Sequence, residues 1–117
     1  MTFIEQLHAL EIDADATLAR FGGNEALLAK FLKKFLDDPS YSEVQSAWEQ
    51  KQWDALERAA HTLKGVAGNL GMTRLFSLSN EMVQRIRRKE QEGLEKLYAE
   101  LETEYSHVIA GLSKCGF

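Results

Sequence analysis

The sequence is poor in residues that break helices or cross-link chains. Its 117 residues include one proline, Pro39, and one cysteine, Cys115. A single cysteine cannot form an internal disulfide, and this favours a reducing compartment such as the cytoplasm. Because one proline and no Gly/Ser-rich tract leave little room for a linker, we expect residues 1–117 to form a single domain.

Long apolar runs and an excess of positive charge are also missing. No run approaches the roughly 20 residues that a membrane-spanning helix needs, and the N-terminus lacks the basic and apolar segments of a signal peptide. The net charge is −4 at pH 7, whereas nucleic-acid binders are normally basic. We therefore expect partners other than membranes and nucleic acids.

The sequence also lacks a strict alternation of apolar and polar residues, so it predicts no strand. Apolar residues instead recur at steps of three and four residues, which is typical of helices that bury one face. This spacing predicts short helices over 2–10 and 13–20, followed by helices over 24–37, 40–48, 53–70, 72–89 and 92–112. Because short turns join the helices, we expect an all-α antiparallel four-helix bundle with one or two short additional N-terminal helices.

Residues that start and stop helices stand at the expected boundaries. Asp13, Asn24 and Ser40 are the predicted N-caps, because short polar side chains accept bonds from free backbone N–H groups. Gly22-Gly23 and Gly71 are the predicted turns, since glycine tolerates the left-handed conformation. Within 24–37 the apolar stripe expected to face the core consists of Leu27, Leu28, Phe31, Leu32 and Phe35.

One histidine, His61, stands apart from the apolar stripe of its helix. Each residue turns a helix by about 100°, which places the apolar residues of 53–70 on the side opposite the imidazole. Two glycines inside a helix cost roughly 1 kcal/mol each relative to alanine, and packing gives no reason to clear the surface around one imidazole. We infer that another molecule reaches this histidine. The residues within about 60° of it are Glu57, Arg58, Lys64, Gly65 and Gly68.

Other kinds of chemistry find little support in the sequence. No serine or cysteine stands in a recognisable triad with a histidine and a carboxylate, and the glycines lack the strand context of a nucleotide-binding loop. His8, His61 and His107 have no metal-ligand spacing. We therefore expect no enzyme activity from the chain alone, no ATP site, no metal and no cofactor.

The segment from His61 to Gly71 resembles the signature of a known family. The motif His61-x-Leu63-Lys64-Gly65, followed by Ala67 and Asn69-Leu70-Gly71, is similar to that of histidine phosphotransfer (HPt) domains of multistep phosphorelays. The entry to the helix over 24–37 looks like the same family. The resemblance implies a helical phosphoryl carrier in two-component signal transduction.

The resemblance also implies roles for individual residues. His61 would accept the phosphoryl group through Nε2, Lys64 would stabilise that group, and Gly71 would set the turn of the helical hairpin. Gly65 would leave room for the partner's active site. The partner-docking residues that we expect in addition are Arg58, Gly68, Gln84 and Arg87.

The partners implied are receiver domains of response regulators or a hybrid sensor histidine kinase, with Mg²⁺ held by the receiver and this chain a monomer. One position departs from the family pattern. Several members carry a Gln or Glu that orients the histidine, and the spacing places that position at Val83, with Asn80 and Gln84 nearby.

Two rival functions remain open at this stage. The chain could be a non-catalytic helical adaptor, or the dimerisation and phosphoacceptor domain of a sensor kinase; the absence of an ATP-binding region and of an acidic residue after His61 disfavours the latter. The basic run Arg85–Lys89 fits either a solvated helix end or a patch that meets a partner. The chain suits a stand-alone protein and a C-terminal domain of a hybrid kinase equally.

Overall fold

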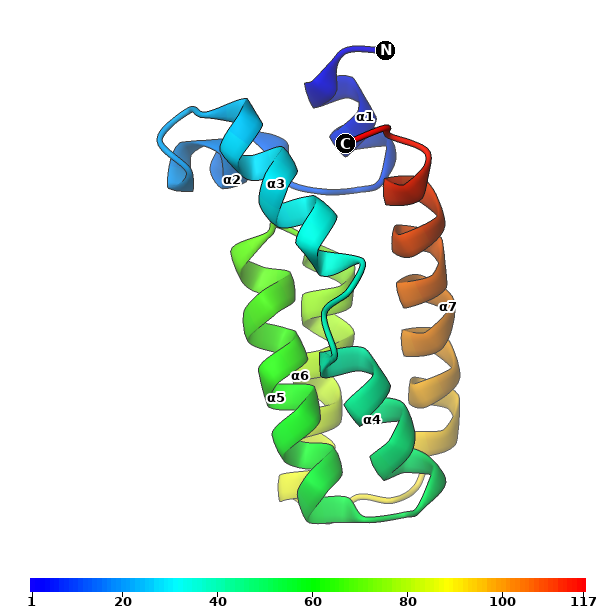
Figure 1. Ribbon diagram of the computed structural model, residues 1–117. Coiled ribbons are helices and arrows are strands. Elements are labelled where there is room, and N and C mark those ends of the chain that lie inside the picture. The colour runs from blue at the N-terminus through cyan, green and yellow to red at the C-terminus, as the bar shows by residue number, and fades with distance from the viewer.

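Seven α-helices make up the computed structural model, which describes all 117 residues (Figure 1). Neighbouring helices α4, α5, α6 and α7 run in opposite directions and form the predicted antiparallel bundle. The all-α class is therefore confirmed. The bounds are α1 Phe3–Ala9, α2 Ala14–Arg20, α3 Glu25–Phe35, α4 Ser40–Glu49, α5 Trp53–Asn69, α6 Thr73–Arg87 and α7 Leu94–Ser113.

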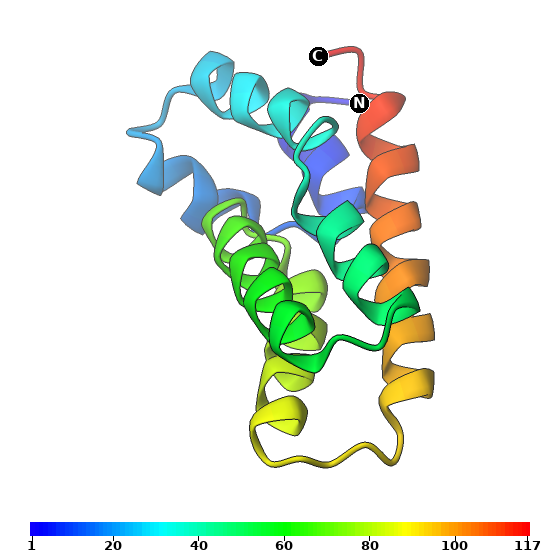
Figure 2. The same cartoon turned by 60° about the horizontal axis from the view of Figure 1, so that its bottom comes forward.

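The fourth side of the bundle is built from two helices instead of one. Helix α4 has 10 residues, against 17 in α5 and 20 in α7, and α3 continues above it over the upper end of the bundle (Figures 1 and 2). The break comes at Pro39, whose ring and missing N–H end a helix. Helices α1 and α2 are thus the short N-terminal helices that the sequence predicts, and α3 and α4 share the fourth side of the bundle.

Helix starts follow the predicted caps with one exception. The side chains of Asp13 and Asn24 accept hydrogen bonds from Ala16 N (3.3 Å) and Leu27 N (3.0 Å), as predicted. The prediction that Ser40 is an N-cap is wrong, because α4 already begins at this residue. Asp38 Oδ1 accepts from Ser40 N at 2.9 Å and so satisfies the free N–H that a cap would otherwise serve.

The predicted apolar stripe of α3 is only partly buried. Leu28, Leu32 and Phe35 are buried in the core, as predicted, whereas Leu27 and Phe31 are each 38% exposed. This part of the prediction was wrong because α3 lies at the end of the bundle, where the other helices cover a narrower strip of its surface than they cover on α5.

An aromatic seam joins α4 to α7. Tyr41 stacks on Tyr105 with ring centroids 3.9 Å apart and planes 6° apart, and Trp48 stacks on Tyr98 at 4.8 Å and 9°. The two rings on each helix are seven residues apart and therefore share one face. Since each stack fixes which residues meet, the pair of stacks sets the antiparallel register of α4 against α7.

Helix α5 turns its small and branched residues toward the core. Leu56, Ala59, Ala60, Leu63 and Ala67 are all buried, in a core of 27 hydrophobic residues drawn from every helix. Burial of this face leaves the opposite face of α5 at the surface. None of the helices is both long and apolar enough to cross a membrane.

The N-terminal segment is fastened to the C-terminal end of α5. The Arg20 guanidinium donates to Gly68 O at 3.0 Å and to Asn69 O at 3.3 Å, two carbonyls of the last turn of α5. Asp13 N donates to Gly71 O at 2.9 Å. Gly71 has φ +72°, and a Cβ at this position would overlap Thr17 Oγ1. The predicted turn is confirmed, and close packing of α2 adds a second reason for the glycine.

Candidate functional site

His61 lies in the middle of α5 on its solvent-facing side. The side chain is exposed and makes no hydrogen bond to another residue of the chain. Leu56 and Leu63, on the opposite side of the helix, are fully buried, as the periodicity predicts. Both ring nitrogens are therefore open to an incoming molecule.

Two contacts between α5 and α6 bracket this histidine. One turn earlier, Glu57 Oε2 lies 3.5 Å from Arg87 Nε, and one turn later the Lys64 Nζ lies 5.8 Å from the centre of the Phe76 ring. Because α5 and α6 run antiparallel, the part of α6 midway between Phe76 and Arg87 lies opposite His61. That part contains Asn80, Val83 and Gln84.

The side chain at Val83, the position that the resemblance assigns to a residue orienting the histidine, does not reach the surface. Val83 is fully buried, whereas Asn80 and Gln84 are half-buried at the same level of α6. A buried isopropyl group can neither donate to nor accept from the imidazole. Asn80 and Gln84 are the amide side chains that α6 presents near His61, and neither forms a hydrogen bond with it in this structure.

The two glycines on the histidine face serve different purposes. A Cβ placed at Gly65 would meet nothing within 4 Å, so the space beside this residue opens outward. A Cβ at Gly68 would lie 3.0 Å from the Phe76 ring, so Gly68 admits an aromatic side chain of α6. Intramolecular packing thus accounts for Gly68, whereas nothing inside the chain accounts for Gly65.

Positive charge flanks His61 on both sides along α5. Arg58 and Lys64 stand three residues before and after it, at spacings that share a helix surface. Arg58 is exposed and forms no ion pair; it lines a groove of about 280 Å³ between α4 and α5 together with Glu43. Lys64 is half-buried beside Phe76, a cation–π contact of about 0.5–1 kcal/mol at such sites.

Comparison with known proteins identifies the chain's family, because residues 26–111 match the Hpt domain. The chain belongs to the Hpt domain family. Similar proteins are the sensory/regulatory proteins RpfC of two strains of Xanthomonas campestris pv. campestris, each 31% identical to it over 68 residues. The match covers 56% of this Hpt domain and 9% of each relative, so the chain spans less than a tenth of their length. No solved structure matches significantly.

Family membership confirms the resemblance seen in the His61–Gly71 segment. Hpt domains carry out histidine phosphotransfer in phosphorelays, where they interact with receiver domains. They act as phosphocarriers and are not classical enzymes. The matched residues include all of α5 and α6, so His61 and its neighbours on both helices lie within the part of the chain that matches the family.

Ion pairs occupy most of the basic run at the end of α6. Arg85 binds Glu81 at 3.1 Å and also donates to Glu92 O at 2.9 Å, while Arg88 Nε lies 3.3 Å from Glu90. Arg87 is paired with Glu57, as described above. Arg87 is therefore the one arginine of this run that the structure joins to the helix carrying His61.

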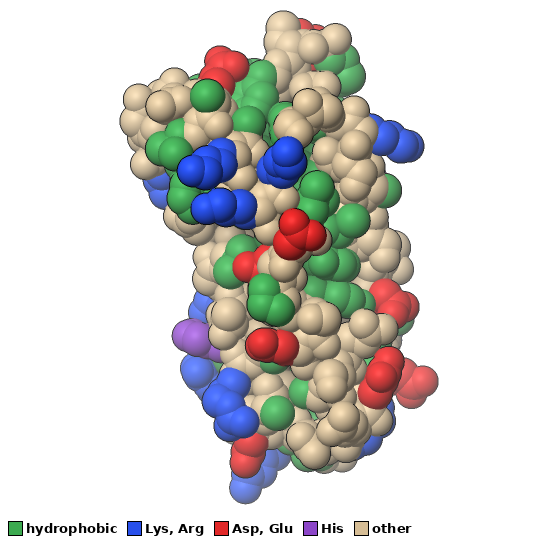
Figure 3. Space-filling model, in the orientation of Figure 1, with side chains coloured by type: hydrophobic (Ala, Val, Ile, Leu, Met, Phe, Trp, Pro, Cys, Tyr) green, Lys and Arg blue, Asp and Glu red, His purple; other side chains and the backbone are tan.

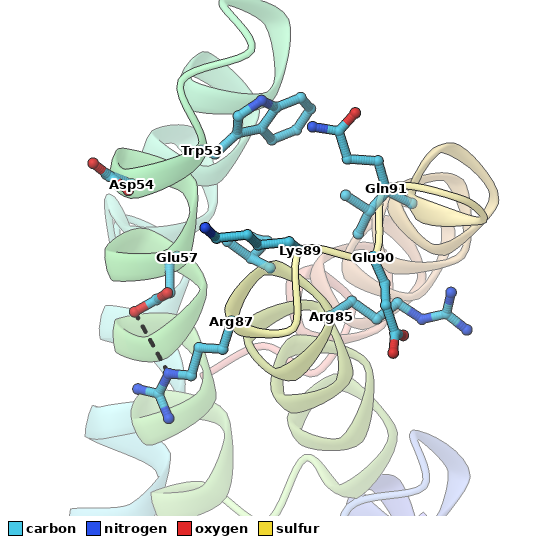
Figure 4. Close-up of a pocket in the computed structure, with 10 residues that line it drawn as sticks. Trp53, Asp54, Glu57, Arg85, Arg87, Lys89, Glu90 and Gln91 are labelled. Atoms are coloured by element: carbon cyan, nitrogen blue, oxygen red, sulfur yellow. Dashed lines mark ion pairs between the residues drawn. The ribbon is translucent and has the colours of Figure 1, made fainter.

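A pocket of about 490 Å³ opens beyond the Glu57–Arg87 pair, between the start of α5 and the loop from α6 to α7 (Figure 4). Trp53 forms one wall and Gln91 faces it, while the Lys89 side chain extends toward α5 below them. Sequence reasoning missed this pocket because its walls come from three separate segments. A positive φ of +57° at Lys89, which no sequence pattern signals, helps to shape it.

A second surface that the sequence did not single out lies on α3. Exposed lysines gather over this helix in Figure 3, namely Lys30, Lys33 and Lys34. Beside them Phe31 packs against Phe21 with centroids 5.2 Å apart. This end of the Hpt domain, whose net charge is −4, is therefore basic and partly apolar.

Proposed function

We propose that this Hpt domain accepts a phosphoryl group on His61 from an aspartyl phosphate of one receiver domain and passes it to an aspartate of a second receiver. The observation that carries the proposal is the exposed imidazole, unbonded within the chain, beside the open space at Gly65. Arg58 and Lys64 on either side add the positive charge that a phosphoryl group requires.

The transfer step conserves atoms and charge in a simple way. The lone pair of Nε2 attacks phosphorus, a P–N bond forms, and the P–O bond to the receiver's aspartate breaks with its electron pair left on the carboxylate. Nδ1 keeps its proton throughout. Catalysis of phosphoryl transfer rests mainly on in-line positioning and on neutralising charge. The receiver would supply Mg²⁺, and the residues of this chain supply the nucleophile and its surrounding cations.

Three neighbours of His61 have distinct roles in this proposal. Lys64 leaves the Phe76 ring and binds the phosphoryl oxygens, because a charge-assisted hydrogen bond is stronger than an exposed cation–π contact. Gly65 lets the receiver's loops approach the helix backbone. Gln84 of α6 turns its amide toward the ring and holds it for attack, replacing the side chain that Val83 cannot provide.

Substitution of His61 by glutamine tests the proposal. We expect the wild-type domain to become labelled by a ³²P-phosphorylated receiver without ATP, and His61→Gln to remain unlabelled. Because the side chain is exposed, the variant should keep its helicity and melting temperature. His107→Gln, at an exposed position on α7, is the matched control and should accept the label normally. Labelling of the His61→Gln protein would contradict the assignment.

A further inference from the structure

Glu57, the acidic residue closest in sequence to His61 on the same face of α5, is paired with Arg87 of α6. Glu57 precedes His61 by one helical turn, at the i, i+4 spacing that brings side chains together. Its carboxylate lies 3.5 Å from Arg87 Nε, with side-chain exposures of 33% and 51%. Both side chains are therefore open to solvent, and each can leave the other for a new charged partner.

The geometry of this pair leaves the terminal nitrogens of Arg87 without a hydrogen-bond acceptor in the chain. The pair is joined through Nε, 3.5 Å from the Glu57 carboxylate, which is longer than a typical hydrogen bond. In Figure 4 the two terminal nitrogens of Arg87 lie on the side away from the pocket, in the direction in which α5 continues beyond Glu57. His61 follows one turn further in that direction.

We propose that Glu57 is a positioning residue that sets how strongly His61 holds its phosphoryl group. It keeps Arg87 beside His61 while the ring is free, and it yields the guanidinium to the phosphoryl oxygens once the ring is phosphorylated. This inference rests on the proposed function of His61. Glu57, an acidic side chain that the transfer step does not require, thus has a defined role in the site.

Charge dictates the direction of the exchange. A phosphoryl group brings close to two negative charges at neutral pH, and a carboxylate one helical turn away repels it. Arginine binds phosphate through two parallel N–H donors, a stronger arrangement than its single contact with Glu57. Glu57 therefore lowers the affinity of His61 for the phosphoryl group, which makes phosphorylated His61 a better donor to the next receiver.

The other cations near the ring have no such competitor. Arg58 forms no ion pair, and Lys64 contacts an aromatic ring, which carries no charge. The ion pairs of Arg85 and Arg88 lie within α6 and the loop that follows it. Exchange between a carboxylate and a phosphoryl group is thus specific to Glu57 and Arg87.

The test measures the equilibrium between a phosphorylated receiver and this domain. Each variant is mixed with the same ³²P-labelled receiver, and the ratio of the two phosphorylated proteins is read after the reaction stops changing. We expect Glu57→Gln to shift this ratio toward phosphorylated His61 by about two- to five-fold, the size typical of exposed charge pairs. Glu57→Asp, which keeps the charge, should restore the wild-type ratio.

Two further measurements separate a site effect from a general one. Glu81→Gln removes the same charge from an ion pair within α6 and should leave the ratio unchanged. In 1 M salt, where the Debye length is about 3 Å, the effect of Glu57→Gln should shrink markedly. The ³¹P resonance of phosphorylated His61 should move in Glu57→Gln and in Arg87→Gln.

Specific outcomes overturn the proposal. Equal shifts of the ratio in Glu57→Gln and Glu81→Gln would mean that the change in net charge alone alters the phosphorylation equilibrium. A full effect of Glu57→Gln in an Arg87→Gln background would mean that no arginine is exchanged. A wild-type domain that accepts no phosphoryl group overturns the proposed function together with this inference, whereas normal labelling with an unchanged Glu57→Gln ratio overturns the inference alone.

Discussion

The seam between α4 and α7 is closely packed, whereas the face around His61 on α5 and α6 is open and carries exposed charged contacts. Along the seam, Tyr41 and Trp48 stack on rings of α7 at centroid distances below 5 Å. At the surface around His61, an ion pair at 3.5 Å and a cation–π contact at 5.8 Å join α5 to α6. Close stacking fixes a helix in one register, whereas exposed charges can change partner at small cost.

The contrast shows how a small bundle separates stability from transfer. The seam supplies buried aromatic area that has no place in the chemistry. The His61 face supplies charges and open space, and contributes little to the free energy of unfolding. A substitution at the seam should therefore cost stability with little effect on phosphoryl transfer, and one on the His61 face should impair transfer without a loss of stability. Three predictions test this division.

The largest expected effect on stability is at the seam. We expect Tyr98→Ala to lower the free energy of unfolding by about 2–4 kcal/mol, because it removes a stacked ring and leaves a cavity against Trp48. Urea titration measures this loss. Below the denaturation midpoint, folded Tyr98→Ala should still accept a phosphoryl group at nearly the wild-type rate; a rate loss without unfolding would break the comparison.

The opposite outcome is expected at Gly65. We expect Gly65→Leu to slow phosphoryl transfer by about tenfold or more through crowding of the approach to His61, in line with the sensitivity of such steps to small misplacements. Its stability should rise by up to about 1 kcal/mol, since glycine is a poor helix former and a Cβ here meets nothing within 4 Å.

Ser106→Leu is the matched control for Gly65→Leu, because it adds the same side chain to an exposed position on α7. Rapid-quench kinetics with a phosphorylated receiver and thermal melts give the two readouts. Unchanged transfer by Gly65→Leu would remove the explanation offered for this glycine.

The smallest effect sharpens the description of the seam. The buried Tyr41 hydroxyl makes no hydrogen bond of good geometry, and burial, followed by the nearby Tyr98 hydroxyl, raises its pKa above the ordinary value for tyrosine. We expect Tyr41→Phe to stabilise the fold by about 0–1 kcal/mol, since it keeps the stack on Tyr105 and removes an unsatisfied polar group. A loss of stability in a urea titration would show that the hydroxyl is hydrogen-bonded in solution.

Local signals in the sequence predicted most of the helices and the position of the histidine. Asp13 and Asn24 act as caps and Gly71 adopts a positive φ, as expected from side chains that bond within a few residues. The prediction failed for Ser40 and for the exposed residues of α3, because Asp38 and the end of the bundle decide those details.

The sequence by itself determined that this chain is helical, that His61 faces away from the core and that the chain resembles the Hpt family. These properties depend on periodicity and on a short motif, which operate along one helix. Only the tertiary structure decided that Gly68 makes room for Phe76 and that Glu57 meets Arg87. Such contacts join residues on different helices, and they follow from a register that packing sets between helices.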